Sequence, residues 1–382
     1  MNSRFTLDGS EALESRLDQL CRAVGDRVAA LIPPSRLQAV LLGGGYGRGE
    51  GGVLRQGGGE EPYNDLEFYV FIKGSTILND RRYRAALHHL GEEFTQHIGI
   101  EVEFKILSIE KLRRSPVSMF YYDLVSAHRL VSGPEGALED CDHHRAAHRI
   151  PLHEAARLLM NRSSGLLYSK ELLAKTNFTA EDADFVGRNL AKAKLAMGDV
   201  ILTAYGQYHF SCRERHRRLE KLSQTEATSW ILPFVQVHTD GVEFKLHPFK
   251  SIQPREALQS EHAEISALAK QLWLWLENRR LSRTFDTVEA YALDRGVKCP
   301  ESDPAKNILI TARAFGVSAA LGSGASRYPR ERLLNTLPLL LWSENAFGDP
   351  KLRERVSEEL RVPVTDLSSA VRAYKTIWNR FN

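Results

Sequence analysis

The sequence contains little cysteine and no long apolar run. Its four cysteines are spread over 382 residues, without the close paired spacing that is typical of a disulfide framework or a structural zinc site. No stretch approaches the roughly 18 apolar residues of a membrane-spanning helix, and residues 1–10 are polar, unlike a secretory signal. We therefore expect a cytoplasmic protein with reduced thiols that does not enter a membrane.

A strong excess of charge is also missing. The 51 basic and 48 acidic residues leave a formal charge of +3, so the field of the whole molecule neither attracts nor repels acidic partners strongly. The densest basic stretch, residues 213–221, includes two glutamates and no aromatic side chain that could stack on a base, which favours a solvated helix face. RNA is therefore the least favoured partner.

Apolar spacing predicts both helices and strands in the first part of the chain. Apolar residues recur every three or four positions in some segments and every second position in others. The elements expected here are helices over residues 12–32 and 79–97 and strands over residues 37–42, 65–72 and 100–106. This order predicts an α+β fold, with a small mixed sheet layered with helices.

Helical spacing dominates after residue 150. We expect an α+β domain over residues 1–150, a helical domain over 151–290 and a C-terminal helical region over 291–382. Within the second of these, residues 234–246 alternate around an Asp-Gly pair, which predicts a short β-hairpin.

A glycine-rich loop, Gly43 to Gly52, follows the first predicted strand. Because glycine reaches dihedral angles closed to other residues and leaves no side chain in the way, such a loop can turn consecutive backbone amides toward an anion. A phosphate is the ligand that such a loop is expected to bind. The alternative from the residues alone is a flexible surface turn.

Two carboxylates, Asp65 and Glu67, begin the next predicted strand. Residues two apart project from the same face of a sheet, so these side chains start about 7 Å apart along the strand. The two negative charges repel each other, and a hard divalent cation such as Mg²⁺ relieves the repulsion while it shares its remaining ligand positions with phosphates. The alternative is an exposed strand edge that carries two solvated acids.

A third carboxylate is available from Glu101 or Glu103 in the following strand. Two-metal phosphoryl transfer needs such a cluster, with one ion on the triphosphate and another near the attacking hydroxyl. We prefer Glu103 over Glu101 because it lies deeper in the run. Either glutamate can instead pair with Lys105 on the same face, which would be a structural use.

Together these segments resemble the signature of the polymerase-β-like nucleotidyltransferase superfamily. The likeness rests on Leu42-Gly43-Gly44-Gly45-Tyr46-Gly47-Arg48-Gly49-Glu50 and Asn64-Asp65-Leu66-Glu67, and it covers about residues 37–107. It implies that Gly44 and Gly45 contact the nucleotide phosphates, and that Asp65, Glu67 and a third acid bind Mg²⁺ or Mn²⁺. Three features depart from the pattern: Gly45 replaces a common serine, the loop before the acids is longer, and the second acid is a glutamate.

The activity that the resemblance implies is transfer of a nucleoside monophosphate, such as AMP from ATP, to a hydroxyl or phosphate of a small-molecule or protein acceptor. Residues 1–150 would then be the nucleotidyltransferase domain. The alternative is a nucleotide-binding regulator or partner-binding protein that keeps the fold without turnover. The oligomeric state is left open.

Two basic residues complete the candidate site. Arg48 could reach a phosphate, or it could pair with a neighbouring acid and stiffen the loop. Lys192 lies in a predicted helix over residues 182–205, and the resemblance implies that a lysine from the helical part can cover the nucleotide. For both residues we also keep the structural reading, which for Lys192 is a solvated helix face.

Overall fold

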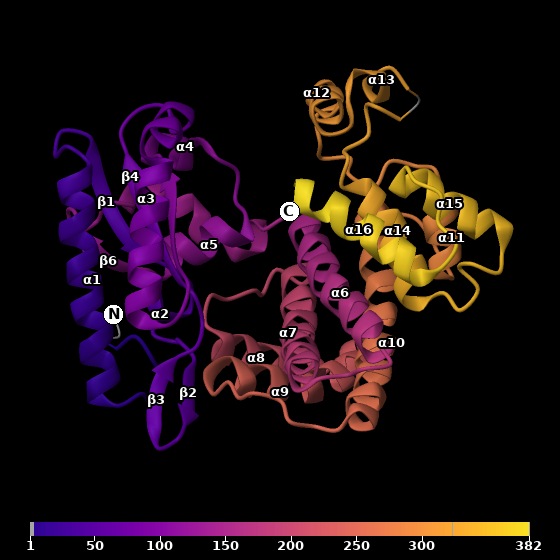
Figure 1. The fold of residues 1–382 in the computed structure, drawn as a ribbon, viewed down its shortest axis with the longest axis horizontal. Coiled ribbons are helices and arrows are strands. Elements are labelled where there is room, and N and C mark those ends of the chain that lie inside the picture. The colour runs from indigo at the N-terminus through magenta and orange to yellow at the C-terminus, as the bar shows by residue number, and fades with distance from the viewer. Residues whose placement is uncertain (1–3, 323, 382) are drawn as a thin grey trace. The chain divides into compact units, whose positions relative to one another are not determined.

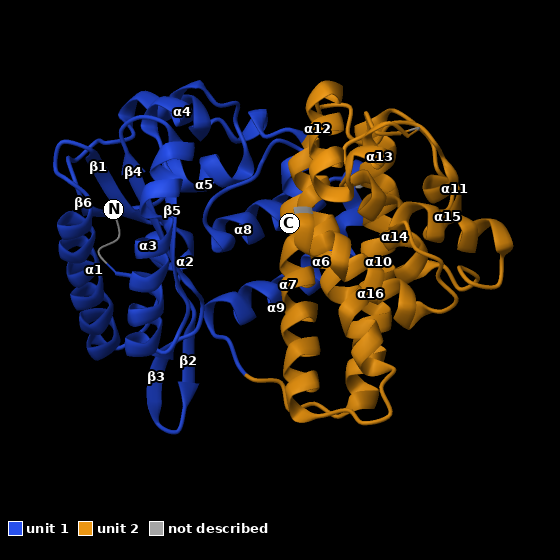
Figure 2. Cartoon of the chain, turned by 45° about the horizontal axis from the view of Figure 1, so that its top comes forward, with its two compact units in different colours: residues 1–151, 201–249 blue, residues 152–200, 250–382 orange. Residues whose placement is uncertain are grey.

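The computed structural model describes residues 4–322 and 324–381. In it the chain forms two compact units. Unit 1 comprises residues 1–151 and 201–249, and unit 2 comprises residues 152–200 and 250–382 (Figure 2). The predicted α+β class is confirmed, since a small mixed sheet near the N-terminus is followed by a mainly helical region (Figure 1). Unit 1 thus takes one segment from far along the sequence.

The main sheet of unit 1 has four strands in the order β5-β4-β1-β6. β4 pairs in parallel with β5, whereas β1 runs antiparallel to both β4 and β6. A separate hairpin pairs β2 with β3. The strands are β1 (Leu37–Leu42), β2 (Val53–Gln56), β3 (Gly59–Pro62), β4 (Leu66–Ile72), β5 (Val102–Leu107) and β6 (Arg129–Ser132).

Helices cover both faces of this sheet. The helices of unit 1 before residue 151 are α1 (Glu11–Leu31), α2 (Gly44–Gly47), α3 (Thr76–Ile98), α4 (Ile109–Arg114) and α5 (Met119–Ser126), with 3-10 turns at Glu139–Arg145 and Ala147–Arg149. The side chains of Ser10 and Ser75 accept hydrogen bonds from backbone N–H groups at the starts of α1 and α3, which satisfies amides that have no partner within a helix. α3 ends at Gly99 in the left-handed conformation, with φ 84°.

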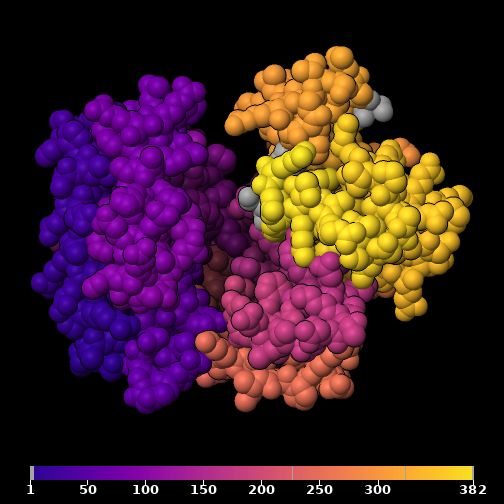
Figure 3. All heavy atoms as spheres, viewed as in Figure 1, coloured from indigo at the N-terminus to yellow at the C-terminus, as the bar shows by residue number. Residues whose placement is uncertain are grey.

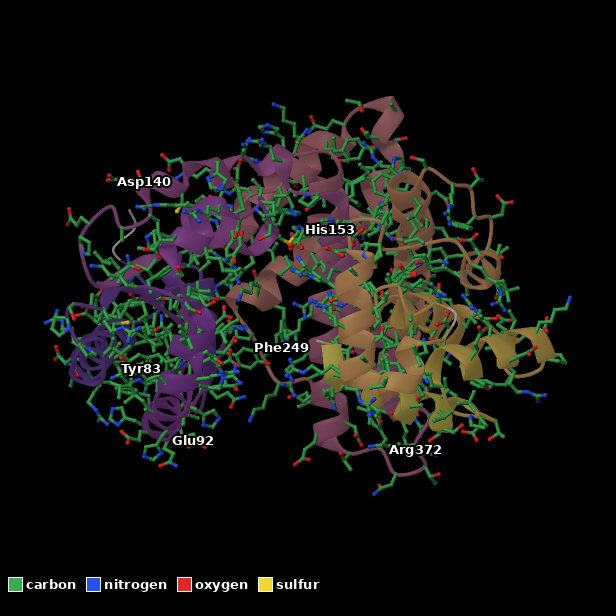
Figure 4. All side chains as sticks on the ribbon, turned by 90° about the horizontal axis from the view of Figure 1, so that it is seen from above. Tyr83, Glu92, Asp140, His153, Phe249 and Arg372 are labelled. Atoms are coloured by element: carbon green, nitrogen blue, oxygen red, sulfur yellow. The ribbon has the colours of Figure 1, made fainter. Side chains whose placement is uncertain are left out.

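The alternating residues of β4 enter two different cores. Phe68 and Val70 pack with α1 and α3, while Tyr69 and Phe71 belong to the core that includes residues of α4 and α5. Side chains of α1 and α3 cover one face of unit 1 (Figure 3). On α3, Tyr83 points into the unit and Glu92 lies at its surface (Figure 4). Because side chains alternate along a strand, Glu67 shares the face of Tyr69.

The second segment of unit 1 is helical, and the prediction of a β-hairpin over residues 234–246 is wrong. The chain forms α8 (Cys212–Ser223), the 3-10 turn Glu226–Ile231 and α9 (Leu232–Leu246). α9 has a proline at its start, where a missing N–H costs nothing, and it packs against α8. Its buried residues include Phe234, Val237 and Gly241, which recur at helical spacing.

Unit 2 consists of helices. They are α6 (Leu152–Leu173), α7 (Ala180–Ala204, which ends in unit 1), α10 (Arg255–Leu281), α11 (Val288–Leu293), α12 (Pro304–Phe315), α13 (Val317–Ala320), α14 (Glu331–Trp342), α15 (Pro350–Leu360) and α16 (Leu367–Phe381). Among the residues that the structure describes, no helix is both long and apolar enough to cross a membrane.

Candidate active site

The glycine loop turns sharply as soon as it leaves β1. The amide of Gly43 donates to the carbonyl oxygen of Glu67 at 2.9 Å, and the amide of Glu50 donates to that of Gly45 at 2.9 Å. Between these contacts lies the single helical turn α2, in which Gly44 has φ +61°. Amides at the start of a helical turn have no partner within it, and those of Gly44 and Gly45 are the amides that the sequence predicts to bind a phosphate.

Close packing explains the glycines. A Cβ atom on Gly43 would lie 2.4 Å from the ring of Tyr69, and one on Gly44 would lie 2.9 Å from Oε2 of Glu67. At Gly45 the Cβ would lie 3.0 Å from the carbonyl oxygen of Glu50 and 3.2 Å from Nζ of Lys245. A serine at Gly45, which is common in the family that the loop resembles, would therefore crowd the carbonyl group of Glu50 and the ammonium of Lys245.

The long connection between the loop and the acids is an ordered hairpin. Its strands, β2 and β3, pair from Val53↔Pro62 to Gln56↔Gly59. After it, the side-chain oxygen of Asn64 accepts from the amide of Gly52 at 3.2 Å and ties the end of the loop to the residue before Asp65. The extra length therefore leaves the acidic pair next to the glycines.

The structure brings Asp65, Glu67 and Glu103 together. Glu67 and Glu103 are register partners on the parallel strands β4 and β5, and Asp65 immediately precedes β4. Desolvation, followed by the negative charge of Glu67, raises the pKa of Asp65; Glu103 adds a smaller contribution, and the positive charge of Lys245 opposes the shift. These carboxylates therefore form a cluster of like charges that a cation would stabilise.

Lys105 lies within this cluster. Its Nζ is 2.7 Å from Oε1 of Glu67 and 3.0 Å from Oε2 of Glu103. Burial lowers the pKa of Lys105, but the hydrogen bonds and charges of the two glutamates outweigh burial and raise the pKa above its ordinary value. Lys105 is therefore an ammonium that partly neutralises the acids.

Lys245 on α9 reaches the glycine loop from the other segment of unit 1. Its Nζ donates to the side-chain oxygen of Asn64 at 3.3 Å and lies beside Gly45. Burial and the positive charge of Arg48 lower the pKa of Lys245 to about 8. Lys245 was not among the predicted site residues, because residues 234–246 were expected to form a hairpin. The helical spacing of Phe234, Val237 and Gly241 is the signal that could have placed Lys245 on a helix.

A network of buried charges anchors the loop. Nη1 of Arg48 is 3.3 Å from Oδ2 of Asp123, and Glu50 accepts from the hydroxyl of Ser211 and, at 2.9 Å, from the amide of Cys212 at the start of α8. The side chains of Arg48 and Glu50 are only 12% and 8% exposed. Arg48 therefore pairs with an acid, which was one of the two roles expected for it. Its contact with a phosphate remains a prediction.

We expect Glu50→Gln to lower the free energy of unfolding by about 2 kcal/mol, since it removes a buried charge that accepts hydrogen bonds. Burial raises the pKa of Glu50, but hydrogen bonds from Ser211 and Cys212 and the charge of Arg48 outweigh it, so the net pKa is lowered. The stabilisation is present above the ordinary carboxyl pKa of 4.5 and is lost as the pH falls through the lower, folded-state value.

Urea unfolding followed by circular dichroism at pH 7 and at pH 3 would measure this effect. The difference between wild type and Glu50→Gln should shrink at the lower pH. Glu61→Gln, at an exposed position of β3, is the control. Equal stability of the two variants at pH 7 would contradict the anchoring role of Glu50.

Two other predicted site residues are solvent-exposed. Glu101 is exposed immediately before β5, and its backbone carbonyl accepts from the amide of Leu66 at 2.8 Å. Lys192 is exposed on α7, within unit 2. Their roles in metal and nucleotide binding stay predictions.

The acid pair supplies the kind of oxygen ligands that a magnesium ion shared with phosphate would need. No group of three or more His, Cys, Asp or Glu side chains is arranged to hold a metal by itself among the described residues. Mg²⁺ is usually bound through one or two carboxylates, with phosphate oxygens and waters completing its octahedron, and Asp65 and Glu67 can supply that part.

Comparison with protein-family models finds no match, and none of the curated proteins matches the chain. The residues of the site therefore carry the functional argument by themselves.

Proposed function

We propose that the chain is a metal-dependent nucleotidyltransferase that transfers a nucleoside monophosphate, such as AMP from ATP, to an acceptor. One observation carries the proposal: a carboxylate of the acidic pair and a partly buried ammonium lie against adjacent glycines of the loop. Glu67 lies against Gly44, and Lys245 lies against Gly45. A polyanion with a bound divalent cation would interact with both groups, since the cation would bind the carboxylate and the anion would bind the ammonium and the loop amides.

In the proposed complex the triphosphate lies along the glycine loop. The amides of Gly44 and Gly45 donate to phosphate oxygens, and Lys245 supplies a positive charge close to the same oxygens. Asp65 and Glu67 would hold Mg²⁺ on the phosphates. Because the ordered network of Arg48 and Glu50 fixes the loop before the nucleotide arrives, little conformational entropy is lost on binding.

The proposed reaction is an in-line displacement at the α-phosphorus. An acceptor oxygen forms a bond to this phosphorus, the bond to the oxygen that bridges to the β-phosphorus breaks, and pyrophosphate leaves with the electron pair. Lys245 and the loop amides stabilise the charge that develops on the pyrophosphate. A nearby carboxylate, Glu103 in our proposal, receives the proton of the acceptor. The bound Mg²⁺ would polarise the phosphate oxygens.

A groove next to the acids offers a place for the acceptor. Its volume is about 850 Å³, and it is formed by one side of α3 and by residues 101–106. Glu103 and Lys105 line it together with Arg84, His88 and Glu92. The mixture of charged and apolar walls suits a small polar molecule or a protein side chain that brings its hydroxyl to Glu103.

We expect His88→Trp to lower transfer of label from α-³²P-ATP to acceptors of a cell extract by about tenfold, since a bulky ring would obstruct the groove. The affinity for ATP, measured by calorimetry, should stay unchanged. His97→Trp is the matched control, because His97 is exposed on the same helix but does not line the groove. An equal loss of label transfer in both variants would contradict the proposal that the groove binds the acceptor.

The activity itself is tested by incubating the protein with Mg²⁺, each labelled nucleoside triphosphate and a cell extract. Pyrophosphate release with label in protein or small molecules supports the proposal, and label in RNA would reverse the ranking of acceptors. Tight ATP binding without pyrophosphate release over hours would instead support the nucleotide-binding regulator.

A further inference from the structure

The cluster of acids contains a cation site that the chain fills with its own side chain. Lys105 is held by Glu67 at 2.7 Å and by Glu103 at 3.0 Å, and its Nζ lies 5.9 Å from the centre of the Tyr69 ring. An aromatic face attracts a cation in the same way as the carboxylates do, although more weakly. All three contacts come from the neighbouring strands β4 and β5.

This position is where a second divalent ion would have to bind. Glu67 and Glu103 are register partners, so an ion shared by their carboxylates would lie between them, and that space is taken by the ammonium of Lys105. Two cations at one position repel each other strongly. The ion pairs of Lys105 involve Oε1 of Glu67 and Oε2 of Glu103, whereas Oε2 of Glu67 lies near Gly44; this oxygen and the carboxylate of Asp65 are therefore the ligands that we assign to a metal.

We propose that Lys105 takes the place of the second metal ion, so that the site binds a single divalent cation, on Asp65 and Glu67. This inference rests on the proposed nucleotidyl transfer. The tethered ammonium neutralises Glu103 and stabilises negative charge on the acceptor oxygen. The site therefore works with one metal ion and one lysine, whereas the resemblance of the sequence predicts two metal ions.

Counting bound Mn²⁺ tests this directly. Titration in the presence of α,β-methylene-ATP, followed by electron paramagnetic resonance of free Mn²⁺, should give one tightly bound ion in the wild type. In Lys105→Met a second ion should bind at least tenfold more tightly than any second ion of the wild type. Adding Glu103→Gln to Lys105→Met should remove that second ion again. Circular dichroism verifies that each variant is folded.

Lys73→Met, at an exposed position just after β4, is the control for the loss of one positive charge, and it should bind one ion. Two tight ions in the wild type, or one ion with unchanged affinity in Lys105→Met, would overturn the role of Lys105. Retention of the second ion by the double variant would overturn it too. If neither wild type nor variant bound Mn²⁺, the proposed function itself would fail, and the inference with it.

Discussion

Replacing Lys245 by methionine is expected to weaken ATP binding and to slow pyrophosphate release by a combined factor of about 10² to 10³. Methionine keeps the length and most of the volume of the side chain, so α9 should still pack. What disappears is the ammonium that lies beside Gly45 and donates a hydrogen bond to Asn64. The phosphate charges would then be stabilised only by the loop amides and the bound metal ion.

The pH dependence adds a second test of Lys245. The pKa of this lysine in the free protein is lowered to about 8, whereas bound phosphates favour the charged form and raise the pKa. The affinity for ATP should therefore be constant below pH 8 and fall by up to about tenfold per pH unit above it. In Lys245→Met this decline should be absent.

Calorimetric titration of ATP from pH 6.5 to 9.5 measures both effects. Lys221→Met is the matched control, because Lys221 is an exposed lysine of α8 in the same unit. A control variant that loses as much affinity as Lys245→Met, or a Lys245→Met variant with wild-type affinity at pH 7, would show that the loop binds no phosphate through this lysine.

Asp65→Asn should reduce Mg²⁺-dependent pyrophosphate release by at least about 10³-fold. The amide keeps the shape of the carboxylate but removes a negative ligand from the metal, and the charge of Glu67 alone would hold the ion poorly. Burial and, after it, repulsion by Glu67 raise the pKa of Asp65, and the neutral amide relieves both, so the folded protein should be no less stable than the wild type.

Rates of pyrophosphate release at saturating ATP, with circular dichroism and thermal unfolding as the fold check, decide this prediction. Asp26→Asn, at an exposed position of α1, is the control. Turnover by Asp65→Asn within a factor of about three of the wild type would mean that the acid pair does not hold the catalytic metal.

Much of unit 1 could be predicted from the sequence because its elements depend on local patterns. The strand over residues 37–42 was placed at its observed bounds, and the alternation in β4 assigned Glu67 to the opposite face from Phe68. α9 was mistaken for a hairpin because an Asp-Gly pair between short apolar stretches is typical of a turn. The packing of α9 against the preceding helix α8 favours the helix, and the turn signal of the Asp-Gly pair does not include this contact.

The candidate site was predicted in part for the same reason. The glycine loop, Asp65, Glu67 and Glu103 lie within about 60 residues, and strand periodicity places the acids on one face. Lys245 could not be found this way, since it comes from a segment about 180 residues later. The pairing of Lys105 with both glutamates depends on the register of β4 and β5, which a sequence pattern leaves open.

The central claim, that the glycine loop, Lys245 and the acid pair form one nucleotide site, is tested most directly by a crystal structure with Mg²⁺ and α,β-methylene-ATP. Our account predicts the triphosphate against the amides of Gly44 and Gly45, with a phosphate oxygen within hydrogen-bonding distance of Nζ of Lys245. It also predicts one Mg²⁺ between the phosphates and the carboxylates of Asp65 and Glu67. A nucleotide bound elsewhere, with nothing on the glycine loop, would contradict it.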